Sequence, residues 1–227
     1  MKILVHSNSP TAATGYGQQT GLLAPLLAEH GHDVAISAFY GIQGSVLRWA
    51  PPNGQHAFNL YGCNVHPYGD DIVLAHARNH FGGDLRNGLV LGLIDAWVFN
   101  PDQFQEAHTA WWVPVDHQPT PPRVLDFFKR SGAVPIAMSR FGEQTLRAGG
   151  LDPLYAPHAV DTTVFRPIPQ AEARRHVGIP ETGPIVGMVA ANKGTPSRKG
   201  YPQALLAFAG FLKRHPDAIL YLHTEPT

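Results

Sequence analysis

Two pairs of neighbouring residues in this chain carry side chains that group-transfer chemistry uses. Asp116 and His117 stand together in the proline-rich turn P-V-D-H-Q-P-T-P-P. A carboxylate beside an imidazole, held stiffly by prolines, suits catalysis or the recognition of substrate hydroxyls. Arg198 and Lys199 form the second pair. The guanidinium can fork onto two phosphate oxygens and the ammonium adds a compact charge, so this pair suits a diphosphate.

Both pairs also have a structural interpretation. Polar residues at a helix entry often satisfy loop backbone groups, and Arg-Lys dipeptides are common on solvated surfaces. For Asp116 and His117 both interpretations stay open. Position favours function for Arg198 and Lys199, because they lie just beyond a predicted strand and at the start of a predicted helix, where amides also favour an anion.

The segment G-Y-G at residues 15–17 closes a loop that begins at Ser7 and is rich in small residues. Gly15 and Gly17 can adopt backbone angles closed to other residues, and the amides of the following helix favour anions. We therefore predict a binding loop for phosphate or sugar hydroxyls, although the glycines could also serve only to make a turn. G-Y-G is not the G-x-G-x-x-G fingerprint, so NAD binding is disfavoured.

Two further polar residues follow predicted strands. Asp95 lies near the carboxyl end of the most apolar segment, residues 89–99, and ligands of open α/β sheets bind at that edge. It is a candidate site residue, with the capping of a turn as the alternative. Ser139 precedes a predicted helix at residues 140–148, as its N-cap, and its amide could face a ligand.

The sequence gives no support to a metal site. His76 and His80 fall four residues apart on a predicted helix, but no glutamate follows His76 and no third ligand has a recognisable spacing. No D-x-D motif stands beside a predicted strand end. We expect structural or surface histidines and no bound metal.

The opening residues predict the unit that positions these side chains. An apolar run at 3–5, leucines at helical spacing over 22–27 and a second apolar run at 34–36 indicate a strand, a helix and a parallel strand. Residues 39–55 are rich in turn formers and predict a loop. Further strands are expected at 55–60, 89–99, 110–115, 134–138, 154–156, 184–191 and 218–222. Helices are expected at 71–81 (with Asp70 or Asp71 near its N-cap), 101–107, 123–130, 140–148, 170–177 and 201–214.

This alternation predicts an α/β protein with parallel sheets, divided where proline-bounded extended sequence begins. We expect a Rossmann-like domain at residues 1–157, and a linker with the first βαβ part of a second Rossmann-like domain at residues 158–227. Because a strand-helix-strand piece buries little surface, it either packs on the first domain or belongs to a truncated chain, and we favour truncation.

Composition limits the partners and the compartment. The 227 residues contain 17 Lys+Arg and 17 Asp+Glu, so net charge offers no support for nucleic-acid binding. Cys63 is the only cysteine and cannot form an internal disulfide, which favours a reducing cytosol. Neither a membrane span nor a signal peptide is predicted. We expect a cytoplasmic protein, and its oligomeric state stays open.

Three segments together resemble a known family. The Gly15-Tyr16-Gly17 loop, the linker H-A-V-D-T-T-V-F-R-P at 158–167 and the segment A-A-N-K-G-T-P-S-R-K-G at 190–200 are similar to retaining, nucleotide-sugar-dependent glycosyltransferases of the GT-B fold. The closest resemblance is to glycosyltransferase family four, the "glycosyl transferases group 1" type. The resemblance implies two facing Rossmann-like domains, the first binding mainly the acceptor and the second mainly the donor.

The resemblance also implies roles for the candidate residues. His117 matches the histidine that many relatives place beside the transferred sugar, with Asp116 as its neighbour. Arg198 and Lys199 match the pair that holds the donor diphosphate, which the N-terminal glycine loop also approaches. We assign Tyr16, Asp95 and Ser139 to acceptor or sugar binding. Transfer with retention is implied, with no bound metal and no cofactor besides the nucleotide-sugar substrate, since Arg and Lys replace the metal.

One feature of the family is missing. Relatives carry two glutamates eight residues apart, E-x7-E, that hold the ribose and the sugar, and this chain contains no such pair. We therefore expect an incomplete form that binds donor weakly or not at all. The alternatives are a sugar-nucleotide epimerase or hydrolase of the same architecture, and a non-catalytic binding module. The acceptor stays open among sugars, lipids, proteins, small metabolites and modified nucleic acids, as do the base and sugar of the donor.

Overall fold

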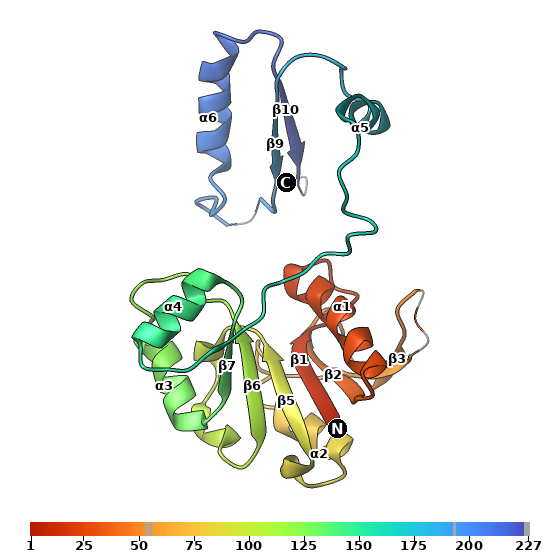
Figure 1. Ribbon diagram of the computed structural model, residues 1–227, viewed down its shortest axis with the longest axis vertical. Helices are drawn as coiled ribbons and strands as arrows, with labels where there is room; N and C mark the ends of the chain where they lie inside the picture. Colours follow the sequence, from red (N-terminus) through yellow and green to blue (C-terminus); the bar gives the residue numbers. More distant parts are fainter. Residues whose placement is uncertain (53, 55, 193, 225–227) are drawn as a thin grey trace. The chain divides into compact units, whose positions relative to one another are not determined.

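The computed structural model describes residues 1–52, 54, 56–192 and 194–224 (Figure 1). The chain divides into two compact units, Met1–Val160 and Asp161–Thr227. They are called the first and second units below, and each is described by itself.

The first unit is built on one eight-stranded sheet with the order β3-β4-β2-β1-β5-β6-β7-β8. All neighbours are parallel except β3, which runs antiparallel to β4. The chain moves outward from β1 in one direction and then returns to the other side of β1 with β5, so the order reverses between these two strands. Ligands of such sheets bind outside the carboxyl ends of the strands at this reversal. The strands are β1 (Lys2–Asn8), β2 (Asp33–Tyr40), β3 (Leu47–Trp49), β4 (Phe58–Tyr61), β5 (Gly88–Leu93), β6 (His108–Val113), β7 (Val134–Ala137) and β8 (Leu154–Tyr155).

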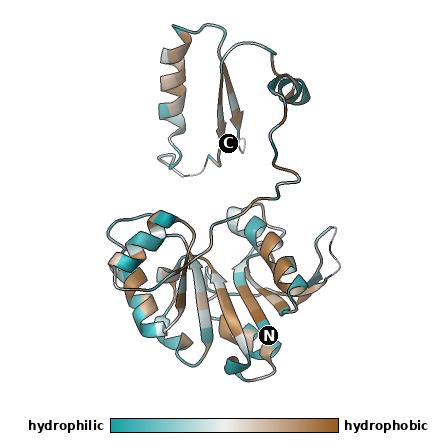
Figure 2. Ribbon diagram, in the orientation of Figure 1, coloured by the Kyte–Doolittle hydropathy of each residue, from teal (hydrophilic) through white to brown (hydrophobic). Residues whose placement is uncertain are grey.

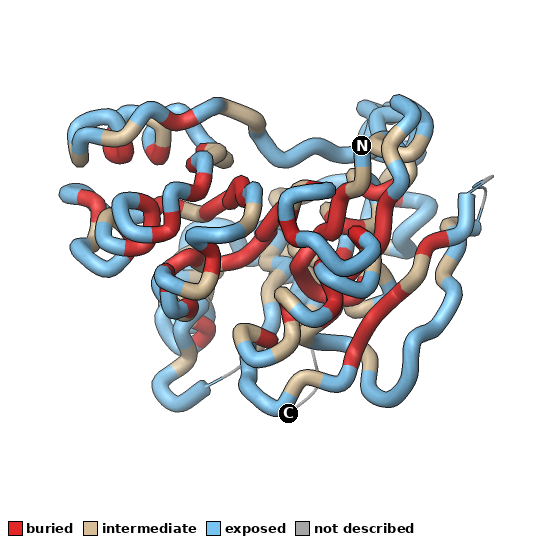
Figure 3. The backbone as a smooth tube through the Cα atoms, turned by 90° about the horizontal axis from the view of Figure 1, so that it is seen from below, coloured by how far each residue is buried: buried red, intermediate tan, exposed pale blue. Residues whose placement is uncertain are grey.

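Helices cover both faces of this sheet, and each face buries its own cluster of side chains. Residues of α1 pack on one face, and residues of α2, α3 and α4 pack on the other. The central strands are accordingly hydrophobic and buried between the layers (Figures 2 and 3). The helices are α1 (Gly15–Glu29), α2 (Val73–Phe81), α3 (Pro122–Ser131) and α4 (Arg140–Ala148), with 3₁₀ turns η1 (Leu85–Asn87), η2 (Ala96–Val98) and η3 (Pro101–Phe104).

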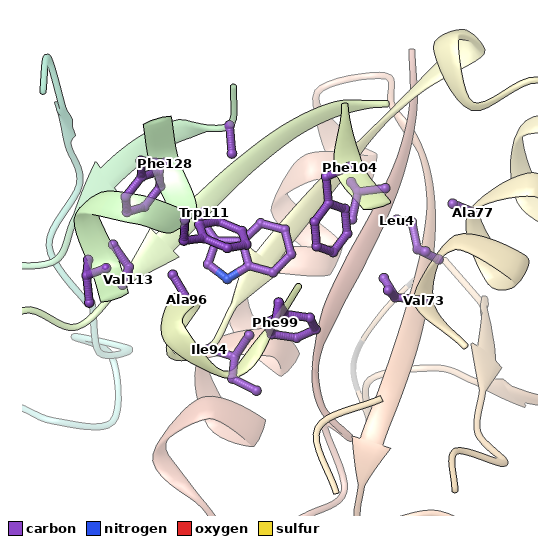
Figure 4. Close-up of a cluster of buried hydrophobic side chains, with 14 of the residues drawn as sticks. Leu4, Val73, Ala77, Ile94, Ala96, Phe99, Phe104, Trp111, Val113 and Phe128 are labelled. Carbon is purple, nitrogen blue, oxygen red and sulfur yellow. The ribbon is translucent and has the colours of Figure 1, made fainter. Parts of the chain in front are cut away.

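An aromatic cluster forms the centre of the larger core (Figure 4). The ring of Trp111 on β6 lies 5.0 Å from those of Phe104 and Phe127 and 5.1 Å from that of Phe99, measured between centroids. A Cβ atom at Gly92 on β5 would lie 2.4 Å from the Trp111 indole, so glycine makes room for this ring. The cluster fixes β5, β6 and α3 to one another, and therefore also the loops that follow the two strands.

A polar chain crosses the same core near the end of β1. His6 Nδ1 lies 2.9 Å from the hydroxyl of Ser37, which lies 2.8 Å from His76 Nδ1. Burial lowers the pKa of both imidazoles to about 4, so both are neutral near pH 7. His80 instead hydrogen-bonds through Nε2 to the carbonyl of Asp33, at 3.0 Å. The expectation of structural histidines on α2 is confirmed.

Asp71 stands next to Ile72, the N-cap of α2, as predicted, and its carboxylate accepts the amides of residues 65 and 66 and so closes a loop. Two local predictions for the first unit are wrong. The predicted loop 39–55 contains β3, an edge strand. The apolar run 89–99 ends as a strand at Leu93 and continues into η2. The strand predicted at 55–60 falls on β4, although its first residue, Gln55, lies outside the described residues.

The second unit contains α5 (Gln170–Val177), β9 (Ile185–Val189), α6 (Tyr201–Leu212) and β10 (Ile219–His223). β9 and β10 are parallel and α6 connects them, which makes the predicted βαβ arrangement. Arg174 is buried and donates to the carbonyls of Pro180, Thr182 and Gly183, so α5 is tied to the approach to β9. Within the described ranges of both units, no helix is long and apolar enough to cross a membrane.

Candidate active site

A cavity of about 590 Å³ lies at the carboxyl edge of the first unit's sheet. Asp95 and Trp97 come from the segment after β5, Asp116 and His117 from the segment after β6, and Arg123 from the first turn of α3. Because β5 and β6 are neighbouring parallel strands, the loops at their carboxyl ends meet. Three residues singled out in the sequence, Asp95, Asp116 and His117, therefore line one cavity.

Asp116 and His117 form a hydrogen-bonded pair in this cavity. Nδ1 of the imidazole lies 2.5 Å from a carboxylate oxygen, and the two side chains are 72% and 86% exposed for His117 and Asp116. Since a carboxylate only accepts, Nδ1–H of His117 donates and the neutral ring is left with Nε2 as an acceptor. The pair can therefore accept a hydroxyl proton at Nε2 while the carboxylate holds the orientation of the ring.

Asp95 is the half-buried acid of the cavity. Burial raises the pKa of its carboxyl group, and the nearby charge of Asp116 raises it further, against the lowering effect of a hydrogen bond from the Trp97 indole. Two carboxylates of one cavity thus lie in different environments, since Asp116 is exposed to solvent. This arrangement suits a division of labour between hydroxyl recognition and proton transfer.

Tyr16 at the start of α1 belongs to the same electrostatic neighbourhood. Burial raises the pKa of its phenol, and the charges of Asp95 and Asp116 add to this effect. The phenol therefore stays protonated as a hydrogen-bond donor near the two carboxylates. The structure brings the β1–α1 segment to the edge at which the β5 and β6 loops meet.

The N-terminus of α1 is capped by Thr14. Its hydroxyl oxygen accepts the amide of Gly17, at 3.0 Å, and a hydrogen bond from the side-chain nitrogen of Asn8, at 2.7 Å. Within the described parts of the chain, the amides of Gly15 and Tyr16 have no hydrogen-bond partner. A helix N-terminus with such amides favours an anion or a ligand hydroxyl oxygen.

The glycines differ from the expectation. Gly15 and Gly17 lie in the first turn of α1, and neither has a positive φ, so the predicted unusual backbone angles are wrong. A Cβ atom at Gly17 would lie 2.5 Å from the carbonyl oxygen of Ala12 and 2.7 Å from that of Ser9. Gly17 is thus required for close packing of the helix on its own loop, whereas a Cβ atom at Gly15 would meet open space.

Ser139 caps α4, as the sequence predicts. Its hydroxyl oxygen accepts the amide of Gly142 at 3.0 Å, and its backbone is extended. Ser139 does not belong to the lining of the 590 Å³ cavity. The contacts of its side chain are those of a helix cap, and its assignment to sugar binding stays a prediction.

Sequence reasoning missed a second hollow, of about 810 Å³, beside the β1–α1 loop. Ala12 and Ala13 of this loop line it together with residues 39–43, at the end of β2 and just beyond it, and residues 63–64 after β4. No charged side chain belongs to this lining. Gly41, with a positive φ directly after a strand at the carboxyl edge, is the signal that could have indicated it.

In the second unit, Arg198 and Lys199 lie in the turn directly before α6. Both are exposed, and in the described part of the chain neither forms an ion pair. Gly200 ends this turn in the left-handed conformation, with φ of 70°, and Pro202 is in the first turn of the helix. The predicted combination of two cations and a helix N-terminus is present, but Pro202 removes one of its amides.

Comparison with known proteins identifies the fold. No protein-family model matches the chain, and a search of curated proteins found no match. An E. coli structure described as trehalose-6-phosphate bound with UDP-2-fluoro glucose matches the whole chain over 65% of its own length, with 10% identity and a TM-score of 0.58. An α,α-trehalose-phosphate synthase (UDP-forming) from Burkholderia vietnamiensis matches the whole chain over 64% of its length, with 11% identity and a TM-score of 0.56.

A glycosyltransferase from Rickettsia africae ESF-5 is a third similar structure. It matches 98% of this chain over 68% of its own length, with 14% identity and a TM-score of 0.53. The chain thus spans about two thirds of the length of these structures. At such identities the likeness defines the fold, which is the predicted GT-B-like α/β arrangement with a Rossmann-like sheet in the first unit.

Proposed function

We propose that this protein is a glycosyltransferase that moves a sugar from a nucleotide-diphosphate sugar to an acceptor hydroxyl, with retention of configuration. The observation that carries the proposal is the gathering of Asp95, Asp116 and His117 in one cavity at the carboxyl edge of a GT-B-like sheet. The fold supplies the class of reaction by analogy, and the cavity supplies the groups that can recognise and orient sugar hydroxyls.

The residues divide the reaction between them. Arg198 and Lys199 bind the diphosphate and stabilise the charge that develops on it as it leaves. The amides of Gly15 and Tyr16 offer further donors to a phosphate or sugar oxygen. His117, oriented by Asp116, lies beside the transferred sugar, and Tyr16, Asp95 and Ser139 bind the sugar or the acceptor.

The proposed step forms one bond and breaks one. The acceptor oxygen bonds to the anomeric carbon on the face from which the nucleoside diphosphate departs, and the bond from that carbon to the phosphate oxygen breaks. The hydroxyl proton passes to a phosphate oxygen of the leaving group. The residues named here supply orientation and positive charge, so the step needs neither a resident metal nor a redox cofactor.

A donor screen tests this function. UDP- and GDP-sugars are incubated with the longest polypeptide that contains this sequence, with and without a panel of acceptors, and released UDP or GDP is measured together with glycosylated product. Acceptor-dependent release, with the product carrying the donor's anomeric configuration, is expected. Release without transfer indicates a hydrolase, interconversion of the donor an epimerase, and neither reaction a binding module; each result overturns the proposal.

A further inference from the structure

Trp97 differs from the other tryptophans of the chain. Trp111 and Trp112 are 0% and 8% exposed, and Trp49 packs on Phe58 with 5.6 Å between ring centroids. Trp97 is 46% exposed and lines the 590 Å³ cavity. Exposing half of an indole forgoes much of the burial free energy that this large apolar side chain offers. A free indole in a cavity offers an apolar face to a ligand.

The Trp97 indole is also held in place. Its neighbours Ala96 and Phe99 are buried in the aromatic core, so the backbone on both sides of Trp97 is fixed. Asp95, two residues earlier, is close enough for the Trp97 side chain to lower the pKa of its carboxyl group. Because this backbone is already ordered, little conformational entropy is lost when a ligand covers the indole.

The other walls indicate what would lie on this ring. Asp116 adds a second carboxylate, His117 an imidazole, and Pro114 and Pro121 apolar surface. A sugar ring matches this wall, because its C–H faces pack on an aromatic plane while its hydroxyls donate to carboxylates. A phosphate or carboxylate would stand close to two like charges, with the exposed Arg123 as the only permanent cation among the lining residues.

We propose that Trp97 and Asp95 form a subsite for an uncharged sugar ring, in which the indole is the platform and the carboxylate binds ring hydroxyls. This inference rests on the proposed function in that the sugar is taken as acceptor or as transferred group. It adds the chemical class of the ligand and a specificity-determining residue, Trp97, to the Asp116–His117 pair. A volume of about 590 Å³ lies within the range of small-molecule sites.

The test measures binding of free sugars to the 227-residue chain by NMR. The probes are methyl α-D-glucopyranoside, glucose 6-phosphate and uridine, observed by saturation transfer and by the ¹⁵N-indole signals of the protein. For the wild type, we expect transfer to the ring protons of the glucoside and a shift of the Trp97 indole signal. Glucose 6-phosphate and uridine are expected to bind at least tenfold more weakly.

Variants assign the effect to the subsite. Trp97→Leu is expected to weaken glucoside binding at least tenfold, and Trp97→Phe, which keeps a ring, about threefold. Asp95→Asn is expected to weaken it about fivefold. Trp49→Phe is the matched control and is expected to bind as the wild type does. Circular dichroism checks that each variant is folded. The shift of the Trp97 indole signal on addition of the glucoside is measured in the wild type, so it tests the subsite even if a variant fails to fold.

The inference is overturned if the wild type binds no glucoside, if Trp97→Leu binds it unchanged, or if glucose 6-phosphate or uridine binds as tightly. Its failure is distinguishable from failure of the proposed function. If the protein transfers sugar but the Trp97 variants bind the glucoside as the wild type does, only the proposed subsite is rejected. If glucoside binding depends on Trp97 but no donor supports transfer, the subsite is supported and only the proposed transferase function is rejected.

Discussion

His117 donates from Nδ1 to the carboxylate of Asp116 across 2.5 Å, in the 590 Å³ cavity beyond the end of β6. A second histidine–aspartate pair exists in the first unit, the exposed His66 with the partly buried Asp70 at 3.1 Å, and it lies outside this cavity. Both pairs consist of an imidazole hydrogen-bonded to a carboxylate, but only the Asp116–His117 pair lies in the cavity. A variant of His66 is therefore a matched control for a variant of His117.

Replacing His117 by alanine is predicted to lower kcat of sugar transfer by about 10²- to 10³-fold, because the group positioned beside the sugar is lost. Unfolding free energy should change by less than about 0.5 kcal/mol, since the side chain is exposed. The comparison is steady-state kinetics with a saturating donor. His66→Ala should keep wild-type kcat, and equal losses in both variants would contradict a specific role for His117.

The first turn of α1 makes a prediction about stability. Gly17→Ala is expected to lower the free energy of unfolding by about 1 to 3 kcal/mol, because the new Cβ atom collides with two carbonyl oxygens. Gly15→Ala should leave it unchanged or raise it by up to about 1 kcal/mol, because that position is open and the backbone is helical. Urea denaturation of both variants decides this. Equal stabilities would show that the loop does not pack on the helix as described.

The buried histidines predict a pH dependence. His6 and His76 have pKa values lowered to about 4 in the fold, against 6.5 for the ordinary side chain. Between pH 6.5 and 4 the unfolded chain therefore binds more protons, so stability is fully present above pH 6.5 and falls as the pH drops toward 4. The loss from pH 7 to 4.5 is expected to be about 3 to 5 kcal/mol for the two groups together.

The measurement is the free energy of unfolding at several pH values, from denaturant titrations. His6→Gln should flatten the slope between pH 6.5 and 4, since one of the two buried groups no longer titrates. The exposed His66→Gln serves as control and should keep the wild-type slope. A His6→Gln variant whose slope equals that of the wild type would contradict the neutral, buried state of this imidazole.

The cations before α6 predict a loss of function without loss of stability. The double variant Arg198→Ala, Lys199→Ala is expected to lower the rate of transfer at least about 100-fold, because the departing diphosphate loses its compensating charge. Its unfolding free energy should stay within about 0.5 kcal/mol of the wild type. Lys213→Ala with Arg214→Ala changes the same charge at the other end of α6. A similar loss of transfer rate in both double variants would show that the rate depends on the net charge of the protein, which would contradict a specific role for Arg198 and Lys199.

Elements with local signals could be predicted from the sequence. α4 at 140–148 and α5 at 170–177 have the predicted ends, because Ser139 caps one helix and Gly178, at φ of 71°, stops the other. The parallel sheet follows from apolar runs that alternate with helical ones. β3 was missed because it is a short edge strand that only pairing with β4 defines.

The site was predictable only in part, since its geometry depends on distant segments. The sequence pointed to Asp95, Asp116 and His117 because they follow predicted strands, and neighbouring strands bring them into one cavity. Trp97 carries no such signal, as an indole after a strand is usually core. The need for glycine at position 17 arises from packing on Ala12, which spacing along the chain does not reveal.

The most direct test of the central claim is a mass balance of the transfer reaction at the Asp116–His117 cavity. Nucleoside diphosphate released and glycosylated product formed are measured together for the wild type, His117→Ala and His66→Ala. Equal molar amounts of both products are expected for the wild type and His66→Ala, and a parallel fall of both is expected in His117→Ala. Nucleoside diphosphate release without matching product, or a His117→Ala variant as active as the wild type, would contradict it.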